Sequence, residues 1–367
     1  MRAVITGGGT GGHLFPGIAL AAAIQEHQPG SEILFIGTPR LMDQETLKNR
    51  GFQLATLSSS GVKGLGMGAQ LRSLLSQPVA IWQARKMLQR FSPELVFGVG
   101  GYVTGPVLLA AKMLGIPTAI HEQNSVPGLA NRIAGRLVDR ICISLPCKPA
   151  FPAEKTVQTG NPVRAEIVAA ARQKERELPA DRPPSLLVLG GSQGAHALNE
   201  RMVQAMKILH SKKLRLQLRH QTGSADADMV RAGYAQHGVE AEVLPFIHDM
   251  AKAYSSADLV VSRAGATSLA ELAVMGLPAI LVPYPYAADD HQATNASYYA
   301  QGGGALVFRE KDLSPEVLAS QIQRLVADTA QLQRMASAMR ALGQPDAAGR
   351  LVAECLSLVQ AKGQAHH

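Results

Sequence analysis

The sequence has little of several features that would place it in a specialised class of protein. It holds three cysteines in 367 residues, Cys142, Cys147 and Cys355, and no CxxC pair, so neither a disulfide framework nor a structural zinc site is expected. Aromatic residues make up only 4% of the chain, which leaves few rings for stacking on nucleic-acid bases. The longest apolar stretches, such as residues 107–111, are far shorter than the roughly 20 residues that span a bilayer. No signal-peptide pattern follows Met1, and we expect a protein of the cytosolic type without nucleic-acid partners.

The rest of the composition is that of a folded chain with two domains. Hydrophobic residues are 46% and charged residues 17% of the sequence, which excludes disordered, collagen-like and coiled-coil chains. At roughly 150 residues per domain, the length indicates two domains, each with a sizeable core. The chain has 36 basic and 28 acidic residues, a formal net charge of +8, so the location of the positive excess matters.

Carboxylates are absent from one long stretch, between Glu45 and Glu94, which also contains the only tryptophan, Trp82. Lysines and arginines alternate there with large apolar residues, a composition typical of a segment that lies on an anionic membrane surface. The residues expected to make this contact are Leu75, Val79, Trp82, Arg85 and Lys86. The alternative is an ordinary basic surface helix whose apolar residues face the core.

Short apolar runs alternate with helical patterns in both halves of the chain. In the first half the runs span residues 2–6, 32–37, 95–100 and 118–122, and in the second half residues 185–190, 214–221, 242–246, 259–262 and 279–283. Strands that alternate with helices in this way predict βα units and parallel sheets. We therefore predict two doubly wound α/β domains, residues 1–162 and 163–344, with a ligand cleft between the carboxyl ends of their strands.

Both halves open with a strand and a glycine-rich turn, at residues 3–12 and 186–195. A strand, a glycine turn and a helix start bring backbone N–H groups and a positive dipole end to one point, which suits phosphate. Residues 7–12 also match the dinucleotide fingerprint GxGxxG, but the second strand ends without the Asp or Glu that would hold a ribose. Arg40 could instead bind a 2′-phosphate, so an NADP-dependent reductase is an open alternative.

Two polar groups of the second half follow strands and suit a nucleotide sugar. Residues 262–271 contain small residues that let backbone amides approach a diphosphate, and Glu271 one turn later can accept both hydroxyls of a ribose. After the next strand, Asp289, Asp290, His291, Gln292 and Asn295 form a polar cluster whose amide and imidazole groups could bind sugar hydroxyls. The spacing of the two aspartates matches no metal motif, and neither a metal nor a cofactor is expected.

Seven segments with these features occur in order: residues 8–17 (GGTGGHLFPG), 98–106 (GVGGYVTGP), 121–124 (HEQN), 160–164 (GNPVR), 190–195 (GGSQGA), 262–271 and 289–295. Together they resemble the MurG family of N-acetylglucosaminyltransferases, glycosyltransferase family 28, over nearly the whole chain. The resemblance implies the GT-B architecture, in which two Rossmann-like domains face across a cleft. It also implies that the family's last helix, for which residues 347–360 within 345–367 are the candidate, crosses back onto the N-terminal domain.

The activity that the resemblance implies is an inverting sugar transfer in peptidoglycan synthesis. GlcNAc would move from UDP-GlcNAc to the muramyl 4-hydroxyl of undecaprenyl-diphospho-MurNAc-pentapeptide (lipid I), at the cytoplasmic face of the inner membrane. The partners would be these two substrates and an anionic membrane surface. Another GT-B enzyme that acts on UDP-GlcNAc, such as the 2-epimerase, would share the nucleotide site but need no lipid acceptor.

The resemblance also assigns the residues of the site. The expected UDP-GlcNAc contacts are Thr10, Gly11, Gly12 and Asn124 on the N-terminal side, and Arg164, Ser192, Ile247, Ala266, Thr267, Ser268, Leu269, Ala270, Glu271 and Gln292 on the C-terminal side. Whether His291 or Gln292 contacts GlcNAc stays open. The first choice for the base that takes the acceptor proton is His13, because imidazole has an unperturbed pKa near 6.5. His13 could instead only hold the loop or the acceptor diphosphate, and Glu122 is the second candidate for the base.

Overall fold

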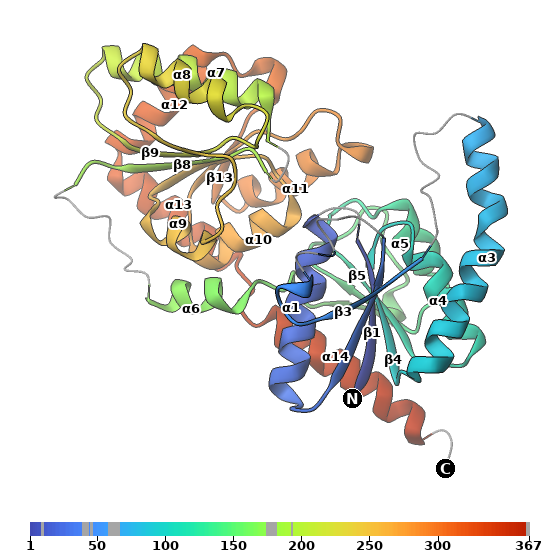
Figure 1. Cartoon of the computed structure of the whole chain (residues 1–367). Helices are drawn as coiled ribbons and strands as arrows, with labels where there is room; N and C mark the ends of the chain where they lie inside the picture. Colours follow the sequence, from blue (N-terminus) through green and yellow to red (C-terminus); the bar gives the residue numbers. More distant parts are fainter. Residues whose placement is uncertain are drawn as a thin grey trace. The chain divides into compact units, whose positions relative to one another are not determined.

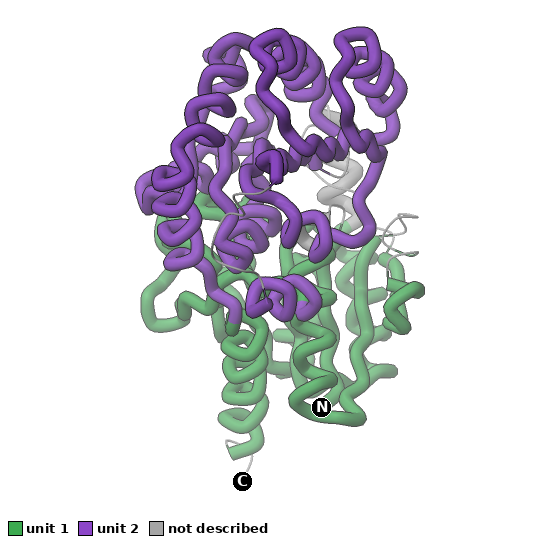
Figure 2. The backbone as a smooth tube through the Cα atoms, turned by 90° about the vertical axis from the view of Figure 1, so that its left-hand side faces the viewer, with its two compact units in different colours: residues 1–164, 346–367 green, residues 165–345 purple. Residues whose placement is uncertain are grey.

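The computed structural model describes residues 1–8, 11–38, 44, 47–57, 67–173, 182–191 and 194–364, with only the backbone described for residues 11–13 and 67–76. The chain forms two compact units, which Figure 2 distinguishes by colour. Unit 1 consists of Met1–Arg164 and Asp346–His367, and unit 2 consists of Ala165–Pro345. Each unit has a parallel sheet and apolar cores of its own.

Unit 1 is built on a seven-stranded sheet with the order β3-β2-β1-β4-β5-β6-β7, in which each neighbouring pair is parallel. Its strands are β1 (Arg2–Gly7), β2 (Glu32–Gly37), β3 (Gln53–Thr56), β4 (Leu95–Gly100), β5 (Thr118–Glu122), β6 (Arg140–Ile143) and β7 (Thr156–Gln158). Its helices are α1 (Gly11–His27), α3 (Met67–Phe91), α4 (Thr104–Met113), α5 (Leu129–Ala134), α14 (Ala347–Gln364) and the 3-10 helix η1 (Ala153–Lys155).

Helices cover both faces of this sheet (Figure 1). Ala3 and Ile5 of β1 pack in a cluster with α1 and α14, whereas Val4 packs in a second cluster with α3 and α4. Every residue of β4 and β5 is buried, because parallel strands covered on both sides have no solvent face. This burial explains why the strands of the sequence are continuous apolar runs and not alternating patterns.

Unit 2 repeats the arrangement with a six-stranded parallel sheet in the order β10-β9-β8-β11-β12-β13. Its strands are β8 (Ser185–Leu189), β9 (Gln217–Gln221), β10 (Glu242–Leu244), β11 (Leu259–Ser262), β12 (Ala279–Leu281) and β13 (Ala305–Val307). Its helices are α6 (Ala165–Gln173), α7 (His196–Ser211), α8 (Ala227–Gln236), α9 (Met250–Ser256), α10 (Ala266–Met275), α11 (His291–Gln301), α12 (Pro315–Ala327) and α13 (Thr329–Ala341), with the 3-10 helices η2 (Ala288–Asp290) and η3 (Glu310–Asp312).

The predicted fold class, two doubly wound Rossmann-like domains, is confirmed. In both sheets the strand order reverses beside the first strand of the unit, between β1 and β4 and between β8 and β11. In open parallel sheets, ligands bind outside the carboxyl ends of the strands at such a reversal. The loops that follow these four strands are therefore the places to look for a site in each unit.

Several of the observed strands differ from those predicted. Four strands of three or four residues, β3, β6, β7 and β13, have no counterpart among the predicted runs. The run predicted over 214–221 forms a strand only from Gln217. Lys213 adopts a left-handed conformation with φ 59°, and the Leu214 N–H donates to the Leu209 oxygen over 3.1 Å. These residues therefore complete the end of α7 before the strand begins.

The C-terminal helix α14 belongs to unit 1. Its side chains Leu351, Val352 and Cys355 are buried in the cluster that β1 and α1 form. Glu354 pairs with Arg140 of β6, with 3.1 Å between the carboxylate oxygen and Nε. Of the helices in the described ranges, none combines the length and apolarity that a bilayer crossing requires.

Candidate active site

Two glycine turns touch where the strand order of unit 1 reverses. Gly101, after β4, has φ 92°, and a Cβ there would lie 2.7 Å from the backbone oxygen of Gly8, after β1. Only glycine allows this backbone-to-backbone approach. Gly11 and Gly12 lie in the first turn of α1 directly after the first of these turns. Of the other predicted site residues here, Thr10 and the side chain of His13 lie outside the described residues, as does Arg40.

Glu122, at the end of β5, is 1% exposed, and its carboxylate binds its own loop. Oε1 accepts hydrogen bonds from the backbone N–H of Asn124 over 2.9 Å and from its Nδ2 over 3.2 Å. Oε2 accepts from the Gly128 N–H over 3.1 Å and from Asn131 Nδ2 over 2.9 Å. A carboxylate has about four acceptor positions, so these bonds leave none for the proton of a substrate hydroxyl. The geometry favours a loop-holding role for Glu122 over the role of base.

Arg164 differs from its expected place. The sequence put it with the second domain, whereas the structure makes it the last residue of unit 1 before α6. Its guanidinium lies over the ring of Phe15 in α1, 5.4 Å from the ring centroid. A cation over an aromatic face is attracted by the ring quadrupole, so α1 orients this arginine.

The glycine turn after β8 in unit 2 is packed as tightly as the turns of unit 1. Gly194 has φ 80°, and a Cβ there would lie 2.3 Å from the backbone oxygen of Thr222. Asn199 of α7 holds that same oxygen, donating from Nδ2 over 2.9 Å. The sequence did not point to Asn199, which is buried behind the turn. Ser192, a predicted contact, lies outside the described residues.

The loop after β11 leads into α10, whose first turn contains Ala266, Thr267 and Ser268. The first N–H groups of a helix have no partner within the helix and point toward an anion. Of the remaining predicted contacts in this helix, Leu269 is buried in the core and offers only its backbone. Ala270 is partly buried.

Glu271 lies in α10 and is 5% exposed. Its Oε2 accepts a hydrogen bond from the hydroxyl of Tyr254 in α9 over 2.9 Å, a partner that the sequence did not indicate. Burying a carboxylate costs free energy unless the carboxylate is hydrogen-bonded. The burial and the bond from Tyr254 therefore distinguish Glu271 from an ordinary surface glutamate. Ile247, which follows β10, is also buried, at 6% exposure.

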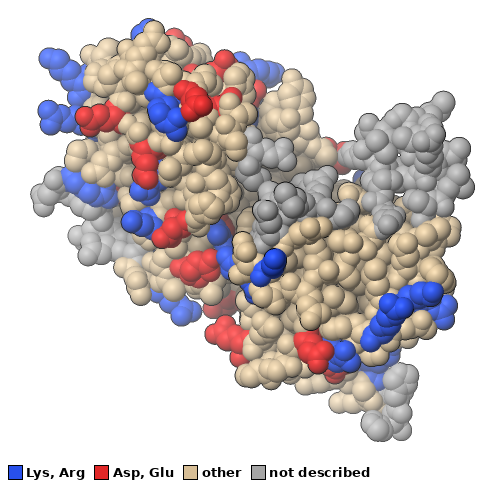
Figure 3. All heavy atoms as spheres, viewed as in Figure 1, with Lys and Arg blue, Asp and Glu red and all other residues tan. Residues whose placement is uncertain are grey.

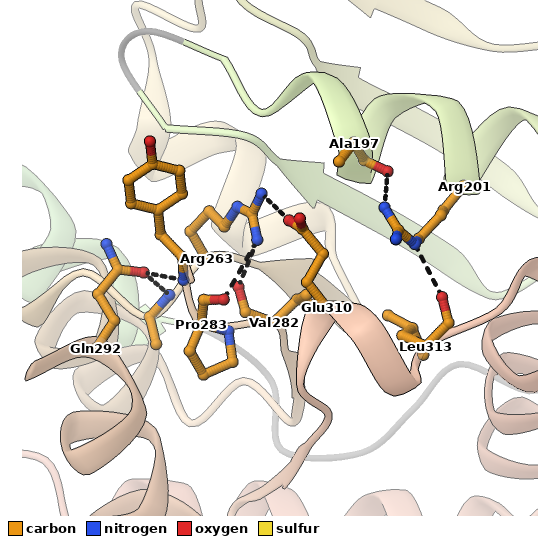
Figure 4. A network of polar contacts seen from close by, with 10 residues as sticks. Ala197, Arg201, Arg263, Val282, Pro283, Gln292, Glu310 and Leu313 are labelled. Carbon is orange, nitrogen blue, oxygen red and sulfur yellow. Dashed lines mark hydrogen bonds and ion pairs between the residues drawn. The ribbon is translucent and has the colours of Figure 1, made fainter. Parts of the chain in front are cut away.

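A polar network joins the loops after β11 and β12 (Figure 4). Gln292, in the first turn of α11, accepts hydrogen bonds at Oε1 from the N–H of Ala264 over 3.1 Å and of Tyr284 over 2.9 Å. His291 bonds through Nδ1 to the Ala288 oxygen over 2.7 Å. Gln292 thus sits between the two loops, while His291 is bound to its own turn. In the described ranges, no three His, Cys, Asp or Glu side chains form a group that could hold a metal ion.

Models of one protein family match both units of the chain. The N-terminal domain of glycosyltransferase family 28 matches residues 3–143, and the C-terminal domain of that family matches residues 185–351. The chain belongs to glycosyltransferase family 28. The match covers the glycine turns of both units and the loops around Glu122, Glu271 and Gln292.

Relatives within family 28 extend over the whole chain. A protein of Desulfotalea psychrophila is 51% identical over 98% of this chain and 97% of its own length, and one of Anaeromyxobacter is 44% identical over 98% and 94%. Both are named UDP-N-acetylglucosamine--N-acetylmuramyl-(pentapeptide) pyrophosphoryl-undecaprenol N-acetylglucosamine transferase. The crystal structure of Acinetobacter baumannii MurG is 35% identical with a TM-score of 0.78, covering 97% of this chain and 99% of that one.

The fold is shared more widely than the family. A putative UDP-N-acetylglucosamine 2-epimerase of Listeria monocytogenes has a TM-score of 0.69 at 14% identity, covering 96% of this chain and 95% of its own. At that identity the likeness concerns the fold alone.

Proposed function

We propose that this chain transfers GlcNAc from UDP-GlcNAc to the muramyl 4-hydroxyl of lipid I, which gives lipid II with inversion at the anomeric carbon. The observation that carries the proposal is the 51% identity over 98% of the chain to a relative named for this transfer. That identity spans the loops of both units, so it favours the transferase over a 2-epimerase or an NADP-dependent reductase. These two alternatives share only the fold or one glycine motif with the chain.

We assign the sugar nucleotide to unit 2 and the acceptor to unit 1. The N–H groups at the start of α10 would bind the diphosphate, and Glu271, buried one turn further, would accept from the ribose hydroxyls. Ile247 would meet the uracil through its backbone. The departing UDP gains negative charge as the glycosidic bond breaks, and fixed N–H donors stabilise that charge without reorganising. Such donors can supply this stabilisation without a metal.

For the base we keep His13, at the start of α1 beside the two glycine turns. Inverting transfer requires a group that takes the proton from the attacking hydroxyl, and general bases of this kind contribute about 10²–10⁴-fold. The four internal hydrogen bonds of Glu122 leave that carboxylate without an acceptor position for this proton. His13→Ala should therefore lower kcat by at least about 100-fold with little change in either substrate's affinity. Near-normal turnover would contradict the assignment.

The proposal is tested by incubating the protein with UDP-GlcNAc labelled in the sugar and with vesicles that contain or lack lipid I. We expect label in the lipid fraction only when lipid I is present. Label that stays on the nucleotide as an epimerised sugar, with or without lipid I, would favour the epimerase. No reaction with either vesicle would contradict a transferase of this substrate class.

We further propose that α3 brings unit 1 to an anionic membrane surface. Ala80, Ala84 and Leu88 of this helix are buried toward the core, whereas Val79 and Trp82 are 54% and 56% exposed. The ammonium of Lys86 lies 3.6 Å from the centroid of the Trp82 ring, and Arg85 is exposed beside it. The alternative, in which the apolar residues of this helix all face the core, does not account for the exposed Trp82. The side chain of Leu75 lies outside the described residues.

The neighbouring helix α4 extends the proposed membrane-binding surface. α4 packs against α3, and its Met113 is 57% exposed. In the view of Figure 3, Lys and Arg side chains form a band on unit 1 over the region that α3 and α4 occupy in Figure 1. Basic side chains near an anionic surface contribute about 1 kcal/mol each, so the contact would be reversible.

The membrane proposal is tested by co-sedimentation with vesicles that contain anionic lipid. Replacing Trp82 by Ser and both Arg85 and Lys86 by Gln should reduce binding by at least about tenfold, while transfer to a soluble acceptor analogue stays within twofold. Changing Lys207 and Lys212, which lie on α7 or at its end in unit 2, to Gln removes two positive charges elsewhere and serves as the control. Equal sedimentation of both variants would contradict the assignment.

A further inference from the structure

Arg263 lies directly after β11 and ties three loops of unit 2 together (Figure 4). Its Nη1 donates to the backbone oxygens of Val282 over 3.2 Å and Pro283 over 3.4 Å, both in the loop after β12. Its Nη2 donates to Glu310 of η3 over 2.5 Å. The two side chains are only 10% and 15% exposed. The planar guanidinium directs its donors at all three partners in a fixed fork, a geometry that the compact ammonium of a lysine does not reproduce.

The loop that Arg263 holds is the one that fixes Gln292. Tyr284 follows Pro283 directly, and its N–H donates to Gln292 Oε1. The other donor to that atom, the Ala264 N–H, follows Arg263 directly. Because an N–H cannot donate to an NH₂ group, these two bonds determine which end of the amide is oxygen. Gln292 therefore turns Nε2 away from both loops, and within the described residues no protein group bonds to that nitrogen.

We propose that Arg263 and Glu310 are positioning residues for the donor sugar, acting through Gln292. The ion pair and the two carbonyl contacts fix the spacing of the two loops, and that spacing presents Nε2 as a hydrogen-bond donor to a sugar oxygen. This inference rests on the proposed function, because it takes the ligand of unit 2 to be a UDP-sugar. It adds two residues that contact neither the nucleotide nor the sugar themselves.

A second ion pair supports the other side of Gln292. Asp290, which precedes α11, is held by Arg309 through two bonds of 2.8 Å and 2.7 Å. Asp289 and Asp290 have φ 54° and 53°, a conformation that non-glycine residues rarely adopt in succession. Arg309 and Glu310 are sequence neighbours, so one short segment holds both the start of α11 and the loop after β11. The Asp290 pair is about half exposed and should matter less than the Glu310 pair.

The test compares the affinities of UDP and UDP-GlcNAc in Glu310→Gln. The variant removes the charge but keeps the shape, so the loops lose their spacing without losing their core. We expect UDP-GlcNAc affinity to fall by about tenfold and UDP affinity to stay within about twofold, because Gln292 is proposed to bind the sugar and not the nucleotide. Arg263→Lys should show the same selective loss. In the transfer assay the KM for UDP-GlcNAc should rise more than the KM for lipid I.

Asp228→Asn is the matched control, because it breaks an exposed ion pair with Arg231 on α8 of the same unit. It should change neither affinity. Equal weakening of UDP and UDP-GlcNAc in Glu310→Gln would indicate a general loss of structure and overturn the inference, as would no change in either. If the wild-type protein binds neither ligand, the proposed function fails, and the inference that rests on it is overturned with it.

Discussion

Unit 1 and unit 2 share one strand order, to which unit 1 adds a seventh strand, β7. Both have polar side chains near the ends of their strands, buried in the case of Glu122 and partly buried in the case of Gln292, but these side chains use their hydrogen bonds differently. In unit 1 the carboxylate of Glu122 accepts four bonds, all from its own loop. In unit 2 Gln292 accepts two bonds at one atom and leaves its other amide atom for a further partner. A side chain whose bonds are all internal stabilises a loop, whereas one with a bond left over at a strand end is suited to bind a ligand.

The comparison predicts that Glu122→Gln acts on stability. The substitution replaces one carboxylate oxygen by an NH₂ group, so two partly or fully buried donors lose their acceptor. Each buried donor without a partner costs about 1–3 kcal/mol, and we expect the free energy of unfolding to fall by about 3 kcal/mol. Urea unfolding measures this loss, with the exposed Glu154→Gln as the control in the same unit. A fully stable Glu122→Gln without transferase activity would return Glu122 to the role of base.

Glu271 should act on ligand affinity, although it is as buried as the groups of unit 1. Glu271→Ala removes the proposed acceptor of the ribose hydroxyls, and we expect the affinities for both UDP and UDP-GlcNAc to fall by about 30-fold, or about 2 kcal/mol. Tyr254→Phe, which removes the hydroxyl that donates to Glu271, should cost less. Isothermal titration measures both ligands. If lipid I affinity fell as much as UDP-GlcNAc affinity, the ribose role would be wrong.

Unit 2 also contains a buried side chain, His220, whose hydrogen bonds are to neighbouring protein side chains. We expect this network to make the stability of the protein depend on pH. His220 is buried between Tyr234 and Asn199, and burial lowers its pKa to about 3. In the unfolded chain its pKa is near 6.5, so the unfolded state takes up a proton first as the pH falls. The stability that neutral His220 contributes is complete above pH 6.5 and is lost progressively toward pH 3.

Between pH 7 and pH 5.5 this loss should be about 1 kcal/mol in the free energy of unfolding. Urea unfolding at the two pH values measures it. His220→Gln should flatten the pH dependence, while His210→Gln, at an exposed position of α7, should not. An unchanged slope in His220→Gln would show that this network does not set the acid stability of the protein.

The doubly wound class of both domains and the places of the loops could be predicted from sequence because buried strands and glycine turns leave clear patterns. The short strands β6 and β13 could not, because they are set by pairing with a neighbouring strand and not by their own residues. The burial of Glu271 was predictable, since a carboxylate among apolar residues one turn after a glycine loop is unusual. Its partner Tyr254 was not, because it comes from the preceding helix, α9.

The positioning residues were the hardest to foresee. Arg263 lies within a recognised motif, but its partner Glu310 is 47 residues away on η3 and has no local signal. For Glu122, the second candidate for the base, the sequence likewise gave no sign of its hydrogen-bond partners. Gly128 and Asn131, which donate to its second oxygen, are six and nine residues further along the chain. The sequence thus indicated which groups lie near the strand ends. It did not indicate which of them keep a donor or acceptor that no other protein group uses.

The most direct test of the difference between the units is the binding of UDP and UDP-GlcNAc to Gln292→Glu. A carboxylate keeps the two backbone bonds to Ala264 and Tyr284 but removes the only donor that the side chain offers. We expect unchanged stability and a fall of at least about tenfold in the affinity for UDP-GlcNAc relative to that for UDP. An unchanged ratio of the two affinities would contradict it.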